Sequence, residues 1–483
     1  MKKTVVLLLI LFVSGCATYP VVKQEDVVNL VKHEKYSQAL NLAKQQGFYQ
    51  EKQNRLLRHL NLGSLHYINK NYYQALKEFD LADEIASEVQ TTSITGALLG
   101  HNPYKGENYE VSLIKYFQSI LHLILYQQGK YESCQINETE KTPEKILSDS
   151  EKKMHFDGAR AILIDWHSIQ EASLIEDPLS KDFTEDILAK TWGSYVHQLH
   201  DNFADVQTRH ILLKSVNRLI QTSYAKYPFL SELNKKKLQN YIKEQQEAKE
   251  AKSLEIVLKT GIIPQKIAHK VEFNINWALA LAAVKGDVLF LNMVIPKGIS
   301  KFEVLRVDKQ KIAPSKKILV YQKNGKLVAE KNIPLISSVS DIMYNKYGSD
   351  LQKTINERKK EIQTACLIGL GVGHVAYKEL MKQIDKISAD ANLNEWEKII
   401  KKAVVTAEIG AVVALAHSTC NGTPVDIRQW ELMPANIFQQ SINLKKGKYK
   451  FKILSNDKEI YSDNIEIKDN QKVFVDINLP TKQ

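Results

Sequence analysis

The feature that most constrains the fold is a regular spacing of small and aromatic residues in the amino-terminal half of the chain. Five residues share it: Gly63, Tyr72, Ala75, Phe79 and Ala82. The last three follow the glycine at intervals of 12, 16 and 19 residues. Small side chains allow two helices to approach closely, and an aromatic ring fills the groove between them. The pattern therefore predicts a packed pair of helices with these five residues in its core.

These intervals resemble those of the tetratricopeptide repeat, a helical pair of about 34 residues. Tyr36 and Ala39 form a weaker copy 36 residues upstream of their counterparts, and Tyr131 and Cys134 occupy the equivalent positions of a third. We therefore expect an α-helical repeat domain, an architecture that usually serves as a protein-binding surface, and we expect Cys134 to be a small buried residue. The alternative is a helical bundle without a ligand.

The beginning of the chain carries an export signal. Lys2 and Lys3 precede an apolar run over residues 4–13, and small residues follow it. This order is typical of a secretory signal, and the apolar run is too short to span a bilayer. The stretch "LFVSGC" resembles the lipobox of bacterial lipoproteins. That resemblance implies cleavage before Cys16 and lipid on its thiol and amino group. The alternative is an ordinary signal peptide that ends beside a cysteine.

The residue after Cys16 indicates which membrane holds the lipoprotein. It is Ala17 rather than the aspartate that keeps many such lipoproteins in the inner membrane. Several acyl chains together anchor a protein stably. We therefore expect a chain that is held by its lipid on the outer membrane and faces the periplasm.

The composition of the mature chain excludes some partners. Cleavage of fifteen residues leaves 468, which is enough for about two to four domains with cores of their own. The loss of Lys2 and Lys3 lowers the formal net charge from +11 to +9. The remaining positive charge is spread over lysine-rich helical segments with interleaved glutamates, which is typical of solvated helix surface. We expect no nucleic-acid partner.

Two motifs resemble those of a known family. The first is a cluster of Asn102, Tyr104, Gly106-Glu107 and Tyr109-Glu110. The second has the order Asp-x-Arg-x-Trp-x-x-Leu-Pro and is formed by Asp426, Arg428, Trp430, Met433 and Pro434, with methionine where leucine is usual. On these motifs the chain resembles a family of uncharacterised tetratricopeptide-repeat-containing lipoproteins of Gram-negative bacteria. The resemblance implies an outer-membrane lipoprotein with repeats, and it implies no reaction.

The carboxyl-terminal half changes from helical to strand-like periodicity. Alternating apolar patterns begin near residue 253, and Asn324-Gly325 between two of them is a strong hairpin signal. Helical patterns then return before a final group of alternating strands. We predict an α+β multidomain chain with a signal peptide (1–15), tetratricopeptide-like helical repeats (16–252), a small antiparallel β-domain (253–338), a helical hairpin (339–425) and a small β-sandwich module (426–483).

Three glycines, Gly369, Gly371 and Gly373, alternate within an apolar run. A dinucleotide-binding loop requires G-x-G-x-x-G directly after a strand, whereas a helical pattern precedes these glycines. We therefore expect the run to form one helix of a buried hairpin. Its second helix contains the apolar run 403–417 and begins at a capping box of Asn394 and Glu397. The alternative is insertion into a membrane, for which the runs are short.

The register of this hairpin predicts the state of two cysteines. If the helices fold back about residue 390, Gly369 faces Val412 and Gly373 faces Glu408. Cys366 then lies opposite residue 415, which is five residues before Cys420 on the second helix, an axial offset of about 7.5 Å. Disulfides require Cα atoms within about 4.4–6.8 Å. We therefore expect free, buried thiols, although an oxidising periplasm would join them if they met.

Few residues in the sequence suggest a metal-binding or ligand-binding site. His197 and His200 share a helical face, but no fixed third ligand and no H-E-x-x-H motif accompanies them, so we expect neither a metal nor a cofactor. Asp426, Arg428 and Trp430 alternate, so an extended chain places all three on one face, just before Pro434. Such a set either holds a glycan or an anion, or forms a structural ion pair under the indole that locks the hairpin to the last module. We favour the structural role.

These observations predict a non-catalytic scaffold or regulator of other envelope proteins, which bind the helical repeats. The alternatives are a cell-envelope enzyme and a glycan-binding module, both acting on peptidoglycan. Convergent carboxylates of shifted pKa in a pocket favour an enzyme, and a long concave groove favours the scaffold.

Overall fold

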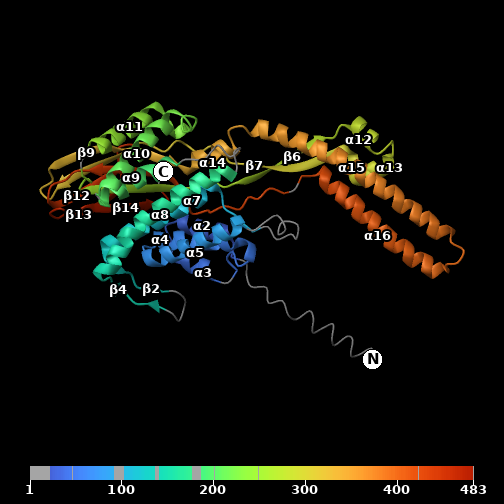
Figure 1. The fold of residues 1–483 in the computed structure, drawn as a ribbon, viewed down its shortest axis with the longest axis horizontal. Coiled ribbons are helices and arrows are strands. Elements are labelled where there is room, and N and C mark those ends of the chain that lie inside the picture. The colour runs from blue at the N-terminus through green and yellow to red at the C-terminus, as the bar shows by residue number, and fades with distance from the viewer. Residues whose placement is uncertain are drawn as a thin grey trace, which may run out of the picture. The chain divides into compact units, whose positions relative to one another are not determined.

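The structure is a computed structural model, and Figure 1 shows its fold. It describes residues 22–45, 47–91, 103–135, 141–176, 186–200, 202–248, 250–422 and 424–481. The predicted signal peptide and Cys16 lie outside these ranges. The chain forms two units: unit 1 comprises the chain up to Pro264, Gln310–Ile342 and Gln429–Gln483, and unit 2 comprises Gln265–Lys309 and Met343–Arg428. The expected α+β class is confirmed by helices and several antiparallel strand pairs.

Helices form most of unit 1. They are α2 (Gln24–Lys32), α3 (Tyr36–Lys44), α4 (Arg55–Ile68), α5 (Tyr72–Thr91), α7 (Asn108–Gln128), α8 (Asp149–Glu176), α9 (Ile187–His200), α10 (Phe203–Gln221) and α11 (Glu232–Glu247). Local sequence explains several of their ends. Glu107 and Glu110 form a capping box at the start of α7, and Gly129 ends that helix with a φ of 65°.

The predicted core residues of the first helical pair lie where α4 and α5 pack together. Ala75, Phe79 and Ala82 are fully buried. A Cβ added at Gly63 would lie 3.0 Å from the Phe79 ring, so the glycine allows the ring to lie against the α4 backbone. Tyr72 is half-buried. These contacts explain the spacing of the small and aromatic residues.

The third predicted copy does not form its second helix. After Gly129 the chain enters two short strands, β1 (Lys130–Tyr131) and β2 (Cys134–Gln135). β1 pairs with β4 (Lys145–Ile146), and β2 pairs with β3 (Lys141–Thr142). The prediction was wrong at this point because the left-handed residue at Gly129 turns the chain out of the helix. Cys134 is nevertheless buried, as expected.

Unit 1 also contains two four-stranded sheets. The first has the order β10-β11-β5-β14 and consists of β10 (Leu335–Ser338), β11 (Pro434–Ile442), β5 (Leu254–Ile262) and β14 (Val473–Leu479). The second has the order β13-β12-β8-β9 and consists of β13 (Lys458–Ile467), β12 (Gly447–Ser455), β8 (Lys316–Gln322) and β9 (Leu327–Ile333). The β8–β9 turn confirms the hairpin predicted from Asn324-Gly325.

These sheets correct the predicted division into separate β-modules. β5, expected in the module 253–338, pairs with β11 and β14 from the expected module 426–483. β8 likewise pairs with β12. β5 is buried along almost its whole length, as a central strand is, and its partners come from the far end of the chain. Local periodicity shows that a strand exists but does not identify a distant partner.

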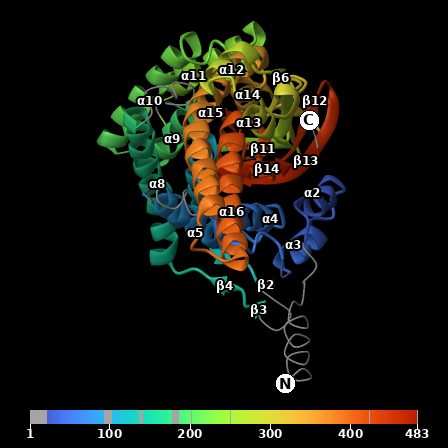
Figure 2. The same cartoon turned by 90° about the vertical axis from the view of Figure 1, so that its right-hand side faces the viewer.

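Unit 2 combines a β-ribbon with helices. Strands β6 (Ile267–Asn274) and β7 (Ile299–Arg306) pair antiparallel. The helices are α12 (Trp277–Ala283), α13 (Val288–Val294), most of α14 (Val339–Tyr347), α15 (Leu351–Ala389) and α16 (Glu395–Cys420). Figures 1 and 2 show α15 and α16 side by side as a long hairpin. The capping box of Asn394 and Glu397 is confirmed.

One face of the hairpin packs on the short helices. Phe290, Leu370 and Ala416 lie in the shared core, together with α12 and α13 residues such as Ala280 and Val294. Among the described residues, no single helix meets the length and hydropathy expected of a membrane span. α12 and α13 meet them only as a pair, and their axes are bent by 114°.

The register and the cysteine state differ from the prediction. A Cβ at Gly369 would meet Thr419, and one at Gly373 would meet Ala416, so the partners lie seven and eight residues farther along α16 than expected. This shift brings Cys366 and Cys420 together in a disulfide, with Cα atoms 4.1 Å apart. The prediction was wrong because α16 begins only at Glu395 and the helices do not mirror one another about residue 390.

Candidate functional site

The two family-like motifs meet at one buried carboxylate in unit 1. Glu110, fully buried on α7, accepts hydrogen bonds from the Tyr104 hydroxyl (2.5 Å) and the Glu107 amide (2.8 Å). Its second oxygen accepts from the Trp430 amide at 2.8 Å. The carboxylate therefore joins the turn before α7 to the chain before β11. No signal in the sequence indicated this contact, since 320 residues separate its partners.

Trp430 lies in the core of unit 1. Its indole nitrogen donates to the Ser64 hydroxyl at 2.8 Å, and its ring centre lies 5.6 Å from those of Phe79 and Phe117. The side chain is fully buried. Trp430 is therefore a packing residue that fastens the chain before β11 to α4, α5 and α7.

The other motif residues are placed differently from the prediction. Arg428 donates to Asp426 through Nε (2.8 Å) and Nη2 (2.6 Å), which forms a partly exposed ion pair in unit 2. Pro434 begins β11 opposite Ile262. The expected common face of Asp426, Arg428 and Trp430 does not form, because the indole is committed to the core of unit 1. The ion pair exists, but not under the indole.

Glu431, which follows Trp430 in the chain, carries a second buried carboxylate. It lies 2.5 Å from the Tyr49 hydroxyl and 2.9 Å from the Asn61 amide nitrogen, both of which donate to it. Burial raises the pKa of Glu431 to about 7, and the nearby charge of Glu110 adds to this effect. Near neutral pH the group is therefore poised between its charged and neutral forms.

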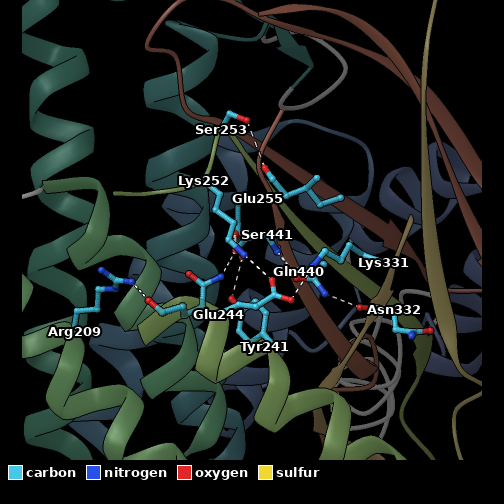
Figure 3. Close-up of polar contacts among 12 residues, drawn as sticks. Arg209, Tyr241, Glu244, Lys252, Ser253, Glu255, Lys331, Asn332, Gln440 and Ser441 are labelled. Atoms are coloured by element: carbon cyan, nitrogen blue, oxygen red, sulfur yellow. Dashed lines mark hydrogen bonds and ion pairs between the residues drawn. The ribbon is translucent and has the colours of Figure 1, made fainter. Parts of the chain in front are cut away.

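A third buried carboxylate, Glu255 on β5, lies at the centre of the network in Figure 3. It accepts hydrogen bonds from the Tyr241 hydroxyl (3.3 Å), the Gln439 amide (2.7 Å) and the Ser441 hydroxyl. Burial raises its pKa to about 7, against the lowering effect of these donors. The network joins α11 to the centre of the first sheet.

Neighbouring residues extend this network to α10 and β9. Gln245 donates to Ser441 at 2.6 Å, and Arg209 donates to the Gln245 backbone carbonyl. Glu244 pairs with Lys252 at 2.8 Å and with Lys331 at 2.7 Å (Figure 3). The polar groups thus bond to one another across four secondary-structure elements, α10, α11, β9 and β11, as buried polar groups must.

A buried ion pair lies beside a polar hollow of about 290 Å³. Lys259 on β5, whose side chain is fully buried, pairs with Asp476 on β14, and the Tyr67 hydroxyl also donates to that carboxylate. Burial lowers the pKa of Lys259, and Asp476 opposes the shift. Tyr72, one of the predicted core residues, lines the hollow together with Tyr461.

The two histidines that share a helical face in the sequence, His197 and His200, have different partners in the structure. His197 bonds through Nδ1 to Asp205 at 2.5 Å, and Arg160 lies 3.0 Å from the same oxygen. His200 stacks on Phe156 instead. Within the described ranges, no group of three or more His, Cys, Asp and Glu side chains has the geometry to hold a metal ion.

Cys134 lies next to a histidine that its sequence position did not suggest. Its Sγ atom is 3.9 Å from His66 Nδ1, 68 residues away in the chain. Burial raises the pKa of Cys134 and lowers that of His66 to about 4. Both shifts favour the neutral forms, whereas a cysteine nucleophile requires a thiolate. The pair is therefore a packing contact.

These sites share one property: donors and acceptors from distant segments bond to one another in the interior of unit 1. Trp430 packs against Phe79 and Phe117. The side-chain amide of Gln127, at the end of α7, donates to the Phe474 carbonyl at 2.9 Å and accepts from the Phe474 backbone amide at 2.7 Å. The surfaces of α5 and α7 at these contacts are therefore packed against later segments of the same chain. Comparison with family models, curated proteins and solved structures finds no match to this chain.

The raised pKa values predict a pH-dependent stability. Glu255 is protonated in the folded state up to a pH of about 7, whereas its ordinary pKa is 4.5. The folded state therefore binds the proton more tightly, and stability falls as pH rises from about 4.5 to about 7, by up to about 3 kcal/mol. Chemical unfolding of Glu255→Gln should show a smaller loss over this range than the wild type, because its amide does not ionise.

Exposed Glu466 supplies the control for this prediction. Glu466→Gln should keep the wild-type pH dependence. Equal pH profiles for wild type and Glu255→Gln would show that Glu255 ionises at its ordinary pKa.

Proposed function

We propose that this chain is an outer-membrane lipoprotein, anchored by lipid on Cys16 and facing the periplasm, that acts as a non-catalytic scaffold for envelope proteins. The lipobox-like stretch before Cys16 supports the anchor. The resemblance of the Glu110 and Trp430 motifs to the lipoprotein family supports the same assignment. In the structure these motif residues stabilise the interior of unit 1, which fits a scaffold.

The observation that carries the scaffold role is the concentration of exposed apolar side chains in unit 2. This unit contains little more than a quarter of the chain, yet it holds 15 of the 26 large hydrophobic side chains that are exposed in the described residues. Contiguous exposed apolar surface is typical of an interaction site. We therefore assign partner binding to unit 2 rather than to the helices of unit 1, whose surfaces at Phe79, Phe117 and Gln127 pack against later segments of the chain.

Photocrosslinking in intact cells tests this assignment. A photoreactive amino acid at Leu289 of unit 2, which is 66% exposed, should yield crosslinks to other envelope proteins. The control position is Ile211, on α10 of unit 1, which is 63% exposed and therefore as accessible as Leu289. Crosslinked proteins identified by mass spectrometry should appear at Leu289 and not at Ile211. The same set of proteins at both positions would contradict the assignment.

The anchor is tested separately by Cys16→Ser. The serine has no thiol to carry lipid, so the variant should remain unprocessed or be released from the membrane. Membrane fractionation and intact-mass measurement report both outcomes. A variant with unchanged mass that still fractionates with the outer membrane would show that Cys16 carries no lipid.

A further inference from the structure

The polar hollow beside the Lys259–Asp476 pair runs along the edge of the first sheet. β14 is the last strand in the order of that sheet and pairs with β5. Five successive residues, from Phe474 to Asn478, line the hollow. Side chains of a strand alternate between its two faces, so a hollow that touches every residue in turn follows the edge of the strand. The hollow therefore lies beside the main chain of β14 over about 13 Å.

Alternate residues of β14 direct their backbone groups away from β5. The Val473 amide donates to the Ser253 carbonyl at 2.8 Å, so the backbone groups of Val473 face β5. Successive residues of a strand direct their N–H and C=O groups to opposite edges. The backbone groups of Phe474, Asp476 and Asn478 therefore point to the outer edge, where the hollow lies.

A carboxamide already fills the first of these three positions. The Gln127 side chain donates to the Phe474 carbonyl at 2.9 Å and accepts from the Phe474 amide at 2.7 Å. It thus bonds to the strand edge as the main chain of a neighbouring strand would. The outward backbone groups of Asp476 and Asn478 have no such partner among the described residues. The edge is therefore protected at one position and open at the next two.

We propose that the open edge of β14 binds a short, extended peptide segment of a partner protein, whose backbone pairs with Asp476 and Asn478. An extended peptide presents N–H and C=O groups to one side at every second residue, which is the spacing of these two positions. Addition of a strand to a sheet edge is a general mode of peptide recognition. The site goes beyond the proposed function, because it lies in unit 1 and uses none of the exposed apolar residues of unit 2.

The walls of the hollow limit the size of the peptide. Tyr72 of α5 and Tyr461 of β13 line it, and its volume is about 290 Å³. One turn of a helix, about 10 Å wide and 5.4 Å long, needs about 400 Å³. The hollow therefore admits a single extended chain with small side chains and excludes a helix. The two rings supply apolar surface beside that chain.

The charges around the hollow favour a peptide without net charge. Asp463 and Lys70 line it with opposite charges, and Asp476 is paired with the buried Lys259. Two carboxylates and two ammonium groups leave no net charge, so neither an acidic nor a basic segment gains from long-range attraction. Recognition therefore depends on main-chain hydrogen bonds and on the fit of small side chains.

A phage-displayed library of random heptapeptides provides the probe. The purified full-length chain should enrich peptides whose affinity, measured by fluorescence anisotropy, falls about tenfold in Asn478→Pro, because one hydrogen bond is lost. Proline removes the outward N–H, and an edge strand tolerates that loss. Asn478→Ala is the matched control: it loses the side chain, keeps the N–H and should bind the peptides as the wild type does.

Hydrogen exchange of the wild-type protein locates the peptide without any substitution. In the free protein the amides of Asp476 and Asn478 should exchange fast, whereas those of Val475 and Ile477, which face β5, should exchange slowly. A selected peptide should slow the first two amides and leave the second two unchanged.

Three results would overturn the proposal. The first is equal affinity of the selected peptides for the wild type and for Asn478→Pro of unchanged melting temperature. The second is a library from which no peptide protects the Asp476 and Asn478 amides. The third is protection of these amides without peptide that rises with protein concentration, which would assign the edge to a second copy of the chain. None of these results changes the crosslinks expected from Leu289, so the two proposals are tested independently.

Discussion

Replacement of Phe79 by alanine should lower the free energy of unfolding of unit 1 by about 3–5 kcal/mol. The ring is fully buried, stacks on Phe117 at 5.1 Å and lies 5.6 Å from the Trp430 ring. Its removal leaves a cavity between α4, α5 and the chain before β11, which backbone at Gly63 cannot fill. Urea unfolding followed by tryptophan fluorescence measures the effect, because Trp430 lies beside the lost ring.

Phe203→Ala is the control for this substitution. Phe203 is 81% exposed at the start of α10, so its truncation should change stability by less than about 0.5 kcal/mol. If Phe79→Ala unfolds at the same urea concentration as Phe203→Ala, the helical pair does not pack around Phe79 as described.

Loss of the disulfide should have a comparable effect on unit 2. The bond closes a loop of 54 residues that contains the whole hairpin tip. In the loop-entropy account, a cross-link of this length stabilises the folded state by about 4 kcal/mol. Differential scanning calorimetry of the Cys366→Ser, Cys420→Ser double variant should therefore show a lower melting temperature for unit 2.

Reductant provides the internal control. It should lower the melting temperature of the wild type and leave that of the double variant unchanged, because Cys134 forms no disulfide. A wild-type protein in which Cys366 and Cys420 react as thiols together with Cys134 after denaturation without reductant, giving three thiols instead of one, would contradict the bond itself.

Local features of the fold were predictable from the sequence. Asn324-Gly325 supplies the turn geometry of a hairpin, and Asn394 with Glu397 satisfies the first amides of α16, so each acts over four residues or fewer. The spacing of Gly63 and Phe79 likewise reflects contact between consecutive helices. Such signals lie within one or two neighbouring elements and leave a periodic trace in the sequence.

The pairing of strands from distant parts of the chain gives no such signal in the sequence. β5 has the composition of a buried strand whichever strand lies beside it, so its pairing with β11 and β14 could not be predicted from local periodicity. The hairpin register depended on the exact length of the loop after Ala389, and an error of seven residues changed the predicted state of both cysteines.

The buried carboxylates were missed for the same reason. Glu255 and Glu431 look like ordinary surface residues in sequence, since acidic residues are seldom buried. Their donors, Ser441 and Asn61, lie 186 and 370 residues away. Trp430 was expected to cover the Asp426–Arg428 pair, whereas its indole lies in the core of unit 1, and its partner Ser64 gave no signal in the sequence.

The order of strands in the first sheet has a consequence for how the chain reaches its native state. Central β5 receives its parallel neighbour, β14, from residues more than 200 positions later in the chain, and Lys259 finds its counter-ion only when Asp476 arrives, 217 residues after it. Pairings this far apart close slowly, because the loop entropy must be overcome before any contact is gained. Unit 1 can therefore complete its folding only after β14 has been synthesised. A chain that stops before residue 473 retains a buried, unneutralised ammonium and an open strand edge, the features that mark a nascent protein for chaperones or proteases.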